Sequence, residues 1–250
     1  MPDYPAAIAA IRDSVVGLMR VRLVRPAALS KGKERPASFN VVFVGTGFCI
    51  ATDRLLFTAV HVFNEGKPRD PSDRFYAFYV PHNGAKAYAR EIISVPYEDP
   101  SLDMAVAEMA VPLQGQPVVT ASSVTLAAVR DGEPVLTYGY PAPTIANARV
   151  DPGGHWLGGN IFLMSHANEG IVSSQYELNG TLHYELNVGW HHGESGGPIF
   201  RATEPVSAFA LMQGYRNIQS PHGVVAGPHV GRALRAAELV LRRLGAAIVD

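Results

Sequence analysis

The chain has 250 residues, of which 47% are hydrophobic and 17% charged, and its formal net charge is −1. This length is enough for one large domain or two small ones with buried cores. The near-neutral charge provides no basic surplus for nucleic acid, and no apolar run reaches the roughly 18 residues of a membrane-spanning helix. The N-terminus has too short an apolar stretch for a secretion signal. We therefore expect a soluble globular protein with no nucleic-acid or membrane partner.

Cys49 is the only cysteine, so no intrachain disulfide can form. Together with the missing secretion signal, this favours a cytoplasmic protein or a domain of a longer chain. Cys49 lies within an apolar run, and we therefore expect it to be a small buried side chain and not a reactive thiol.

The chain begins with a predicted helix over 5–12 and continues as short β-rich runs separated by Gly, Pro and Asp. Such runs indicate a β-sandwich or β-barrel. The predicted strands cover 15–21, 40–50, 55–60, 75–80, 88–95 and 104–109, and then 135–140, 170–178, 182–188, 199–201, 206–215 and 223–226.

The remaining segments connect or close these strands. Residues 30–38 are polar, and 142–169 are rich in Gly, Asn and Pro, so both are predicted to be loops. Residues 113–126 have few charges and no clear period, which favours a crossing between two halves. Leucines recur at helical spacing within 231–249, and we expect a C-terminal helix packed on the second half. A partner-binding or membrane-surface helix is the alternative.

The most informative segment is Gly-Glu-Ser-Gly-Gly-Pro at 193–198. Flanking glycines leave room for the Ser195 hydroxyl and nearby N–H groups to face a substrate, although a glycine-rich turn is the simpler alternative. His61 ends one apolar run and Asp103 precedes another. The order His61, Asp103, Ser195 is one known order of a Ser-His-Asp triad. Asp99 competes with Asp103, but an apolar strand directly follows Asp103.

These residues resemble the chymotrypsin-like (trypsin-fold) serine peptidases, nearest to the bacterial HtrA/DegP-type peptidase domain. The resemblance runs from about residue 12 to about residue 240, and it is specific because several segments agree in order and spacing. The matching segments are Gly-Thr-Gly-Phe-Cys-Ile at 45–50, Leu-Phe-Thr-Ala-Val-His-Val at 56–62, Asp-Met-Ala-Val at 103–106, Tyr-Gly-Tyr-Pro at 138–141, and the segment 223–235.

The resemblance implies an all-β fold of two six-stranded antiparallel barrels with a C-terminal α-helix. Residues 1–112 would hold an N-terminal segment and the first barrel, 113–128 the crossing, and 129–250 the second barrel and the helix. We expect no counterpart of the peptide-binding PDZ domain that usually follows the HtrA-type peptidase, and a processive or trimer-based chaperone role therefore does not carry over from the resemblance.

The resemblance also implies a serine endopeptidase that acts on a polypeptide substrate through an acyl-enzyme, without a cofactor or metal. Ser195 would be the nucleophile, His61 the general base, and Asp103 the group that orients His61. The backbone N–H groups of Gly193 and Ser195 would form the oxyanion hole.

Glu194 departs from the family, which has Asp here in the trypsin type and Asn in the HtrA type. In the trypsin type this Asp pairs with an amino terminus released by zymogen cleavage. Val-Val-Gly at 15–17 faintly resembles such a terminus, but Asp13 and Ser14 stand where an activating cut needs Arg or Lys. We expect Glu194 to pair instead with an arginine, a histidine or a backbone donor. A mispositioned Glu194 would leave the oxyanion hole collapsed until a partner protein or ligand orders it, so latency is an alternative.

The substrate pocket is the least determined part of the site. Trypsin-like enzymes carry an acid six residues before the serine, where this chain has Gly189, which argues against Arg or Lys at the cleavage site. We expect a small or apolar preference, with a histidine-assisted preference for acidic residues or Gln as the alternative. The predicted pocket residues are Gly189, Trp190, His191, His192, Gln213 and Gly214.

Two rival functions use the same residues. Gly-x-Ser-x-Gly at 193–197 also matches the nucleophile elbow of α/β-hydrolases, whose acid and histidine follow the serine. Glu204 followed by His222 or His229 would give that order, but the sequence has no βα alternation. The second rival is an inert binding scaffold with a peptidase fold. All three catalytic residue types stand at the matching positions, which favours the enzyme.

Overall fold

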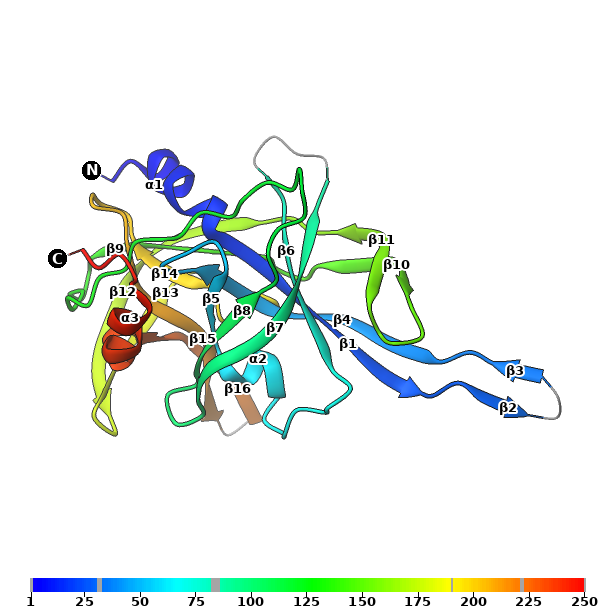
Figure 1. The fold of residues 1–250 in the computed structure, drawn as a ribbon. Helices are drawn as coiled ribbons and strands as arrows, with labels where there is room; N and C mark the ends of the chain where they lie inside the picture. The colour runs from blue at the N-terminus through cyan, green and yellow to red at the C-terminus, as the bar shows by residue number, and fades with distance from the viewer. Residues whose placement is uncertain (1, 31–32, 82–85, 190, 221–222, 250) are drawn as a thin grey trace.

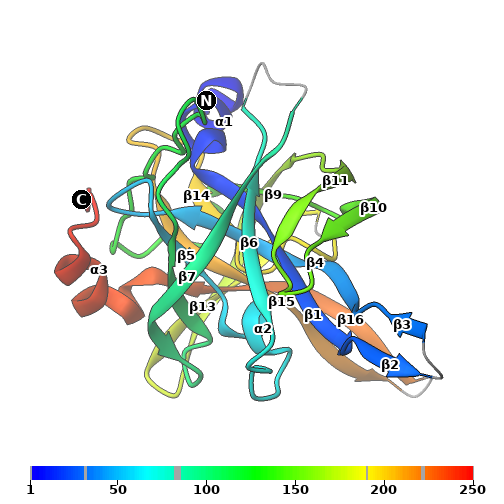
Figure 2. The same cartoon turned by 45° about the vertical axis from the view of Figure 1, so that its right-hand side comes forward.

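The computed structural model describes residues 2–30, 33–81, 86–189, 191–220 and 223–249. The body consists of two closed six-stranded β-barrels, and a short helix lies near the C-terminus (Figures 1 and 2). The predicted all-β fold of two barrels with a C-terminal helix is thereby confirmed. None of the helices in the described part is long and apolar enough to cross a membrane.

The first barrel has the strand order β1-β4-β5-β8-β7-β6, and its neighbouring strands are antiparallel. Aromatic and β-branched side chains fill it, as in the cross-strand pair Phe48 and Phe57, whose ring centroids are 5.8 Å apart. Its strands are β1 (Val15–Arg25), β4 (Ser38–Cys49), β5 (Leu55–Thr58), β6 (Arg74–Tyr79), β7 (Tyr88–Asp99) and β8 (Met104–Met109).

The second barrel has the order β12-β13-β16-β15-β14-β9. Its interior includes Tyr184 and Phe209, which pack edge to face at 5.0 Å. Its strands are β9 (Pro134–Gly139), β12 (His166–Leu178), β13 (Thr181–Asn187), β14 (Pro198–Arg201), β15 (Ala208–Ser220) and β16 (Gly223–Ala233).

Helix α1 (Tyr4–Ile11) precedes the first barrel and is followed by the 3₁₀ helix η1 (Arg12–Ser14). Asp3 caps the start of α1 by accepting a hydrogen bond from the backbone N–H of Ala6. The helix predicted over 5–12 is therefore present, and its buried Ile11 joins the core.

Two sequence predictions about the connecting segments were wrong. The loop predicted over 30–38 contains part of a hairpin of β2 (Ala28–Ser30) and β3 (Lys33–Arg35), which extends β1 and β4 as an arm (Figure 1). The loop predicted over 142–169 contains β10 (Thr144–Val150), β11 (Trp156–Phe162) and the start of β12. The β10–β11 hairpin gains its stability from packing on the first barrel, where Trp156 meets Phe78 at 5.6 Å.

The predicted C-terminal helix is also shorter than expected. β16 continues to Ala233, the 3₁₀ helix η2 spans Leu234–Ala237, and α3 covers only Glu238–Leu244. Gly245, at φ +78°, ends α3, because a left-handed backbone favours glycine. Pairing with β13 and β15 holds residues 231–233 in the sheet and overrides their helical spacing.

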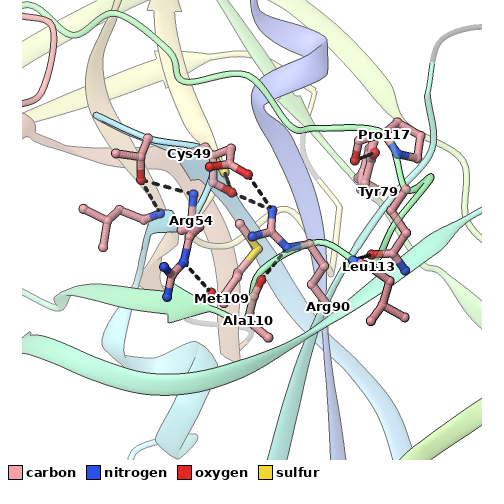
Figure 3. A network of polar contacts seen from close by, with 12 residues as sticks. Cys49, Arg54, Tyr79, Arg90, Met109, Ala110, Leu113 and Pro117 are labelled. Atoms are coloured by element: carbon pink, nitrogen blue, oxygen red, sulfur yellow. Dashed lines mark hydrogen bonds and ion pairs between the residues drawn. The ribbon is translucent and has the colours of Figure 1, made fainter.

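Arginine side chains bind loop carbonyls at one end of the first barrel (Figure 3). The buried Arg90 donates to the carbonyl oxygens of Ala110 at 2.8 Å and of Asp53 at 2.7 Å. Arg54 donates to the carbonyl oxygen of Met109 at 3.3 Å. These bonds satisfy backbone acceptors where β8 leaves the barrel, and they fix the start of the crossing to the second barrel.

Candidate active site

The fold brings His61 and Asp103 together at the ends of two neighbouring strands. β5 and β8 are antiparallel partners, with Thr58 opposite Ala105. The end of β5 therefore lies beside the start of β8. Helix α2 (Val60–Asn64) follows β5 and carries His61 in its first turn, while Asp103 stands directly before β8.

His61 and Asp103 form two hydrogen bonds. The Nδ1 atom of His61 lies 2.8 Å from Oδ2 of Asp103, and the backbone N–H of His61 donates to Oδ1 at 2.9 Å. Burial alone would raise the pKa of Asp103, but the bonds and charge of His61 outweigh it, so the pKa lies below its usual range. Asp103 is therefore a carboxylate at neutral pH, and it holds His61 with Nδ1 as the donor.

Asp103 has a left-handed backbone at φ +52°, an uncommon conformation outside glycine that is concentrated at functional sites. Its competitor Asp99 has a local role: it accepts hydrogen bonds from the backbone N–H groups of Ser101 and Leu102 at 2.9 and 3.1 Å. Asp99 thus stabilises the turn that orients Asp103.

Gln213 connects Ser195 to the His61–Asp103 pair. Its side-chain Nε2 donates to Oδ2 of Asp103 at 3.2 Å, and its carbonyl oxygen accepts from the Ser195 hydroxyl at 3.4 Å. Within the described residues, the Ser195 hydroxyl makes this hydrogen bond and none to the ring of His61. Gln213 was predicted as a pocket residue, but its side chain is directed at the acid of the proposed triad.

Strand β4 of the first barrel packs directly against the Ser195 loop. The backbone N–H of Thr46 donates to the carbonyl oxygen of Ser195 at 2.8 Å. A Cβ atom on Gly196 would lie 2.1 Å from Oγ1 of Thr58 and 2.4 Å from the carbonyl oxygen of Thr46, and its φ is +83°. A side chain at position 196 would push the loop off the first barrel, which explains this glycine physically.

The loop before Ser195 is a tight turn. The backbone N–H of Glu194 donates to the carbonyl oxygen of His191 at 3.2 Å, and Gly193, at φ +104°, occupies the third position. A positive φ there is the mark of a type II turn. A Cβ atom on Gly193 would also lie 2.5 Å from the carbonyl oxygen of Tyr140.

Hydrogen bonds fix the direction of the peptide between His192 and Gly193. The carbonyl oxygen of His192 accepts from the N–H of Ala142 at 2.7 Å, and that of Gly193 accepts from Oγ1 of Thr46 at 2.6 Å. In a trans peptide the C=O and N–H point in opposite directions, so the N–H of Gly193 points away from Ala142. This N–H is therefore held in one orientation, as an anion-binding donor needs to be.

Glu194 is buried, and its carboxyl group binds neutral donors. One oxygen accepts from Nδ2 of Asn168 at 3.0 Å and the other from the backbone N–H of His191 at 2.8 Å. Burial raises the pKa of Glu194 despite these bonds. Val16 lies within β1, opposite Gly47, and its backbone belongs to the sheet. The expected backbone donor is thus present, and the segment that resembles a zymogen terminus lies within a strand.

The other predicted pocket residues lie near this turn. A Cβ atom on Gly189 would lie 3.3 Å from Oδ1 of Asn168, so the Asn168 amide lies beside the predicted pocket floor. His191 and His192 are exposed, and Gly214 leaves open space where a side chain would be. The prediction for Trp190 lies outside the described residues.

The sequence interpretation missed three residues. Thr46 was noticed only as part of a motif, Asn168 lay in a predicted loop, and His229 was considered only for the rejected hydrolase. His229 stands opposite Tyr215 in the β15–β16 pair, and burial together with the charge of His191 lowers its pKa. No signal in one sequence could locate Asn168, because its role depends on where β12 begins.

A family model described as a trypsin-like peptidase domain matches residues 45–207, and the chain belongs to this family. No curated protein matches this chain. Similar solved structures include the HtrA-type protease AlgW with decapeptide, at 16% identity and a TM-score of 0.64, covering 97% of this chain and 67% of that one. A substituted form of AlgW with decapeptide has 16% identity and a TM-score of 0.61, covering 97% and 66%. The chain spans about two thirds of the length of each, and at this identity the likeness shows the fold.

Thr46→Val tests the contact between the first barrel and the Ser195 loop. Its Oγ1 donates to the carbonyl oxygen of Gly193 and accepts from the N–H of Tyr140 at 3.2 Å. Each buried group left unpaired costs about 1–3 kcal/mol. We expect lower stability in urea unfolding together with a loss of serine reactivity. Thr125→Val is the control, because Thr125 is also buried but its hydroxyl accepts from the N–H of Ala127 in its own loop; this variant should lose stability alone. Equal reactivity in both variants would contradict this role of Thr46.

Glu194→Gln tests the buried carboxyl group. A pKa raised by folding means that the folded state binds this proton more tightly than the unfolded state. The contribution of Glu194 to stability is therefore complete below its unfolded pKa and declines as pH rises through its folded pKa. We expect the free energy of unfolding of the variant, relative to wild type, to increase as pH rises through that window. A pH-independent difference, measured by urea unfolding at a series of pH values, would show that the pKa of Glu194 is not raised.

Proposed function

We propose that the protein is a serine endopeptidase that cleaves polypeptides through Ser195, His61 and Asp103. The observation that carries the proposal is the double contact of Gln213. Its side chain binds the Asp103 carboxylate, which in turn binds His61, and its carbonyl oxygen receives the Ser195 hydroxyl. This arrangement supports a site in which the nucleophile of the second barrel would act with the base and acid of the first.

The chemistry follows from the protonation of His61. Because Nδ1 donates to Asp103, Nε2 keeps its lone pair and can accept the Ser195 proton. The Ser195 hydroxyl has to turn from the Gln213 carbonyl toward Nε2, and a substrate N–H then replaces it at that carbonyl. Attack by Oγ on the scissile carbonyl forms a tetrahedral intermediate. His61 returns the proton to the leaving amine, which leaves an acyl-enzyme that water hydrolyses through the same base.

The N–H groups of Gly193 and Ser195 would bind the oxyanion of this intermediate. The bonds from Ala142, Thr46 and Glu194 that hold the turn support an oxyanion hole formed before substrate binds. Such preorganised donors act strongly because they need no rearrangement during the reaction. Latency until a partner protein acts is the alternative, and it requires that the turn be displaced despite these bonds.

Neutral groups around the predicted pocket favour a small, uncharged residue at the cleavage site. Gly189 contributes no side chain, and the adjacent Asn168 amide is neutral. The carboxyl group of Glu194 is engaged by two donors and is not available to a basic side chain. His191 and His229 support the alternative, a preference for an acidic residue or Gln at the cleavage site. A peptide library would decide between the two preferences.

The proposal is tested by digestion of casein with wild type, Ser195→Ala and His61→Ala. Each substitution should lower the rate by about 10⁶-fold, because the triad acts as a unit. Ser165→Ala is the control, since Ser165 bonds the exposed side of Tyr138 and should leave cleavage unchanged. Cleavage that persists in Ser195→Ala would refute the mechanism. A folded wild type without cleavage would favour latency or the inert scaffold. The cytoplasmic location stays a prediction, which cell fractionation would test.

A further inference from the structure

The β15–β16 hairpin extends beyond the second barrel, and beyond Tyr215 the outer edge of β15 is free of strand pairing. β14 pairs with β15 only as far as Leu211, and the carbonyl oxygen of Gly197 accepts from the N–H of Met212. Gly214, Tyr215 and residues 217–219 pair with β16 on one side, whereas Gln213 and Arg216 lie at register shifts. On the other side, no described strand pairs with residues 216–219, and at about 3.3 Å per residue this edge is about 10 Å long.

This edge lacks most of the features that prevent strand addition. Natural edge strands are commonly blunted by Pro, Lys or inward-pointing charges. Between 213 and 219 the only charged residue is Arg216, whose guanidinium is held by Glu185 of β13 at 3.0 Å. Register shifts lie between Met212 and Gly214 and between Tyr215 and Asn217, and beyond them the pairing is regular to the end of the strand.

Apolar surface accompanies the edge. Ile218 is 40% exposed and stands opposite Val225, which is 48% exposed, so the two share one face of the hairpin. Nearer the serine, a cleft of about 320 Å³ runs beside Gly214 and Tyr215 and is also lined by Tyr176, Leu178 and Val230. The missing side chain of Gly214 leaves this cleft open.

The chemistry at Ser195 determines which part of a substrate meets this edge. The carbonyl oxygen of Gln213, beside the nucleophile, needs an N–H donor when the serine turns away. The nearest such donor belongs to the residue whose carbonyl is attacked. The chain that continues along β15 is therefore the acyl side, N-terminal to the scissile bond.

We propose that residues 216–219 of β15 bind the fourth to sixth substrate residues before the scissile bond as an added antiparallel strand. The preferred segment is extended and uncharged, with an apolar side chain facing Ile218. This inference rests on the proposed function, because it takes Ser195 as the site of cleavage. It makes the hairpin a second recognition element that selects unfolded or extended segments over short peptides.

The test is equilibrium binding of fluorescein-labelled peptides to the Ser195→Ala variant, followed by anisotropy. All peptides share the acyl-side residues Val-Thr-Ala before the scissile bond and the same leaving segment after it. Alternating Val and Thr residues added at the N-terminal end lengthen the acyl side from three to six residues. We expect the dissociation constant to fall about tenfold or more over this series. N-methylation of alternate amides in the added residues should cancel this increase in affinity, whereas N-methylation of the intervening amides should not.

Ile218→Lys, made in the Ser195→Ala background, should abolish the increase in affinity with peptide length while retaining the affinity for the shortest peptide. Leu239→Lys is the matched control, because Leu239 is 85% exposed on α3 and far along the chain from the hairpin. A dissociation constant independent of length, no binding at any length, or equal gains in both variants would overturn the inference.

Hydrolysis of the same peptides by wild type separates this inference from the proposed function. Cleavage at equal kcat/KM for all lengths would keep the peptidase and reject the added strand. Length-dependent binding by Ser195→Ala without cleavage by wild type would keep the added strand and reject the peptidase.

Discussion

The site depends on one contact between the barrels, the packing of β4 against the Ser195 loop. Thr46 accounts for most of it, since its backbone N–H binds the carbonyl of Ser195 and its hydroxyl binds the carbonyl of Gly193. Gly45 and Gly196 permit the approach, because a side chain on either would collide with the opposite backbone. The glycines of both motifs thus serve one purpose, the close contact of a first-barrel strand with a second-barrel loop.

Gln213 provides the second connection between the barrels. It joins the nucleophile to the acid, while His61 and Asp103 are joined by the ends of β5 and β8. Neighbouring strands therefore support the helix, turn and loop that carry His61, Asp103 and Ser195, which suits a geometry that has to be accurate to a fraction of an ångström. The same strand that holds Gln213 continues as the free edge, so the proposed catalysis and the proposed recognition would share one element.

The short apolar runs predicted a β-sandwich or β-barrel, and the family resemblance of the short motifs implied the two barrels and the pairing of His61 with Asp103. The sequence predictions failed where tertiary packing determines the structure. The β10–β11 hairpin has Gly and Asn typical of a loop, but Trp156 and Ile161 find an apolar face on the first barrel. The role of Asn168 depends on where β12 starts, and the direction of the Gln213 side chain depends on a bulge in β15. Neither property is periodic, so no pattern in one chain reveals it.

The proposed function requires that Ser195 be an activated nucleophile in the folded protein. The most direct measurement is the intact mass of the protein after reaction with a fluorophosphonate, followed by peptide mapping of the adduct. We expect one adduct per chain, located on Ser195. An unmodified chain, or an adduct on another residue, would contradict this role of Ser195.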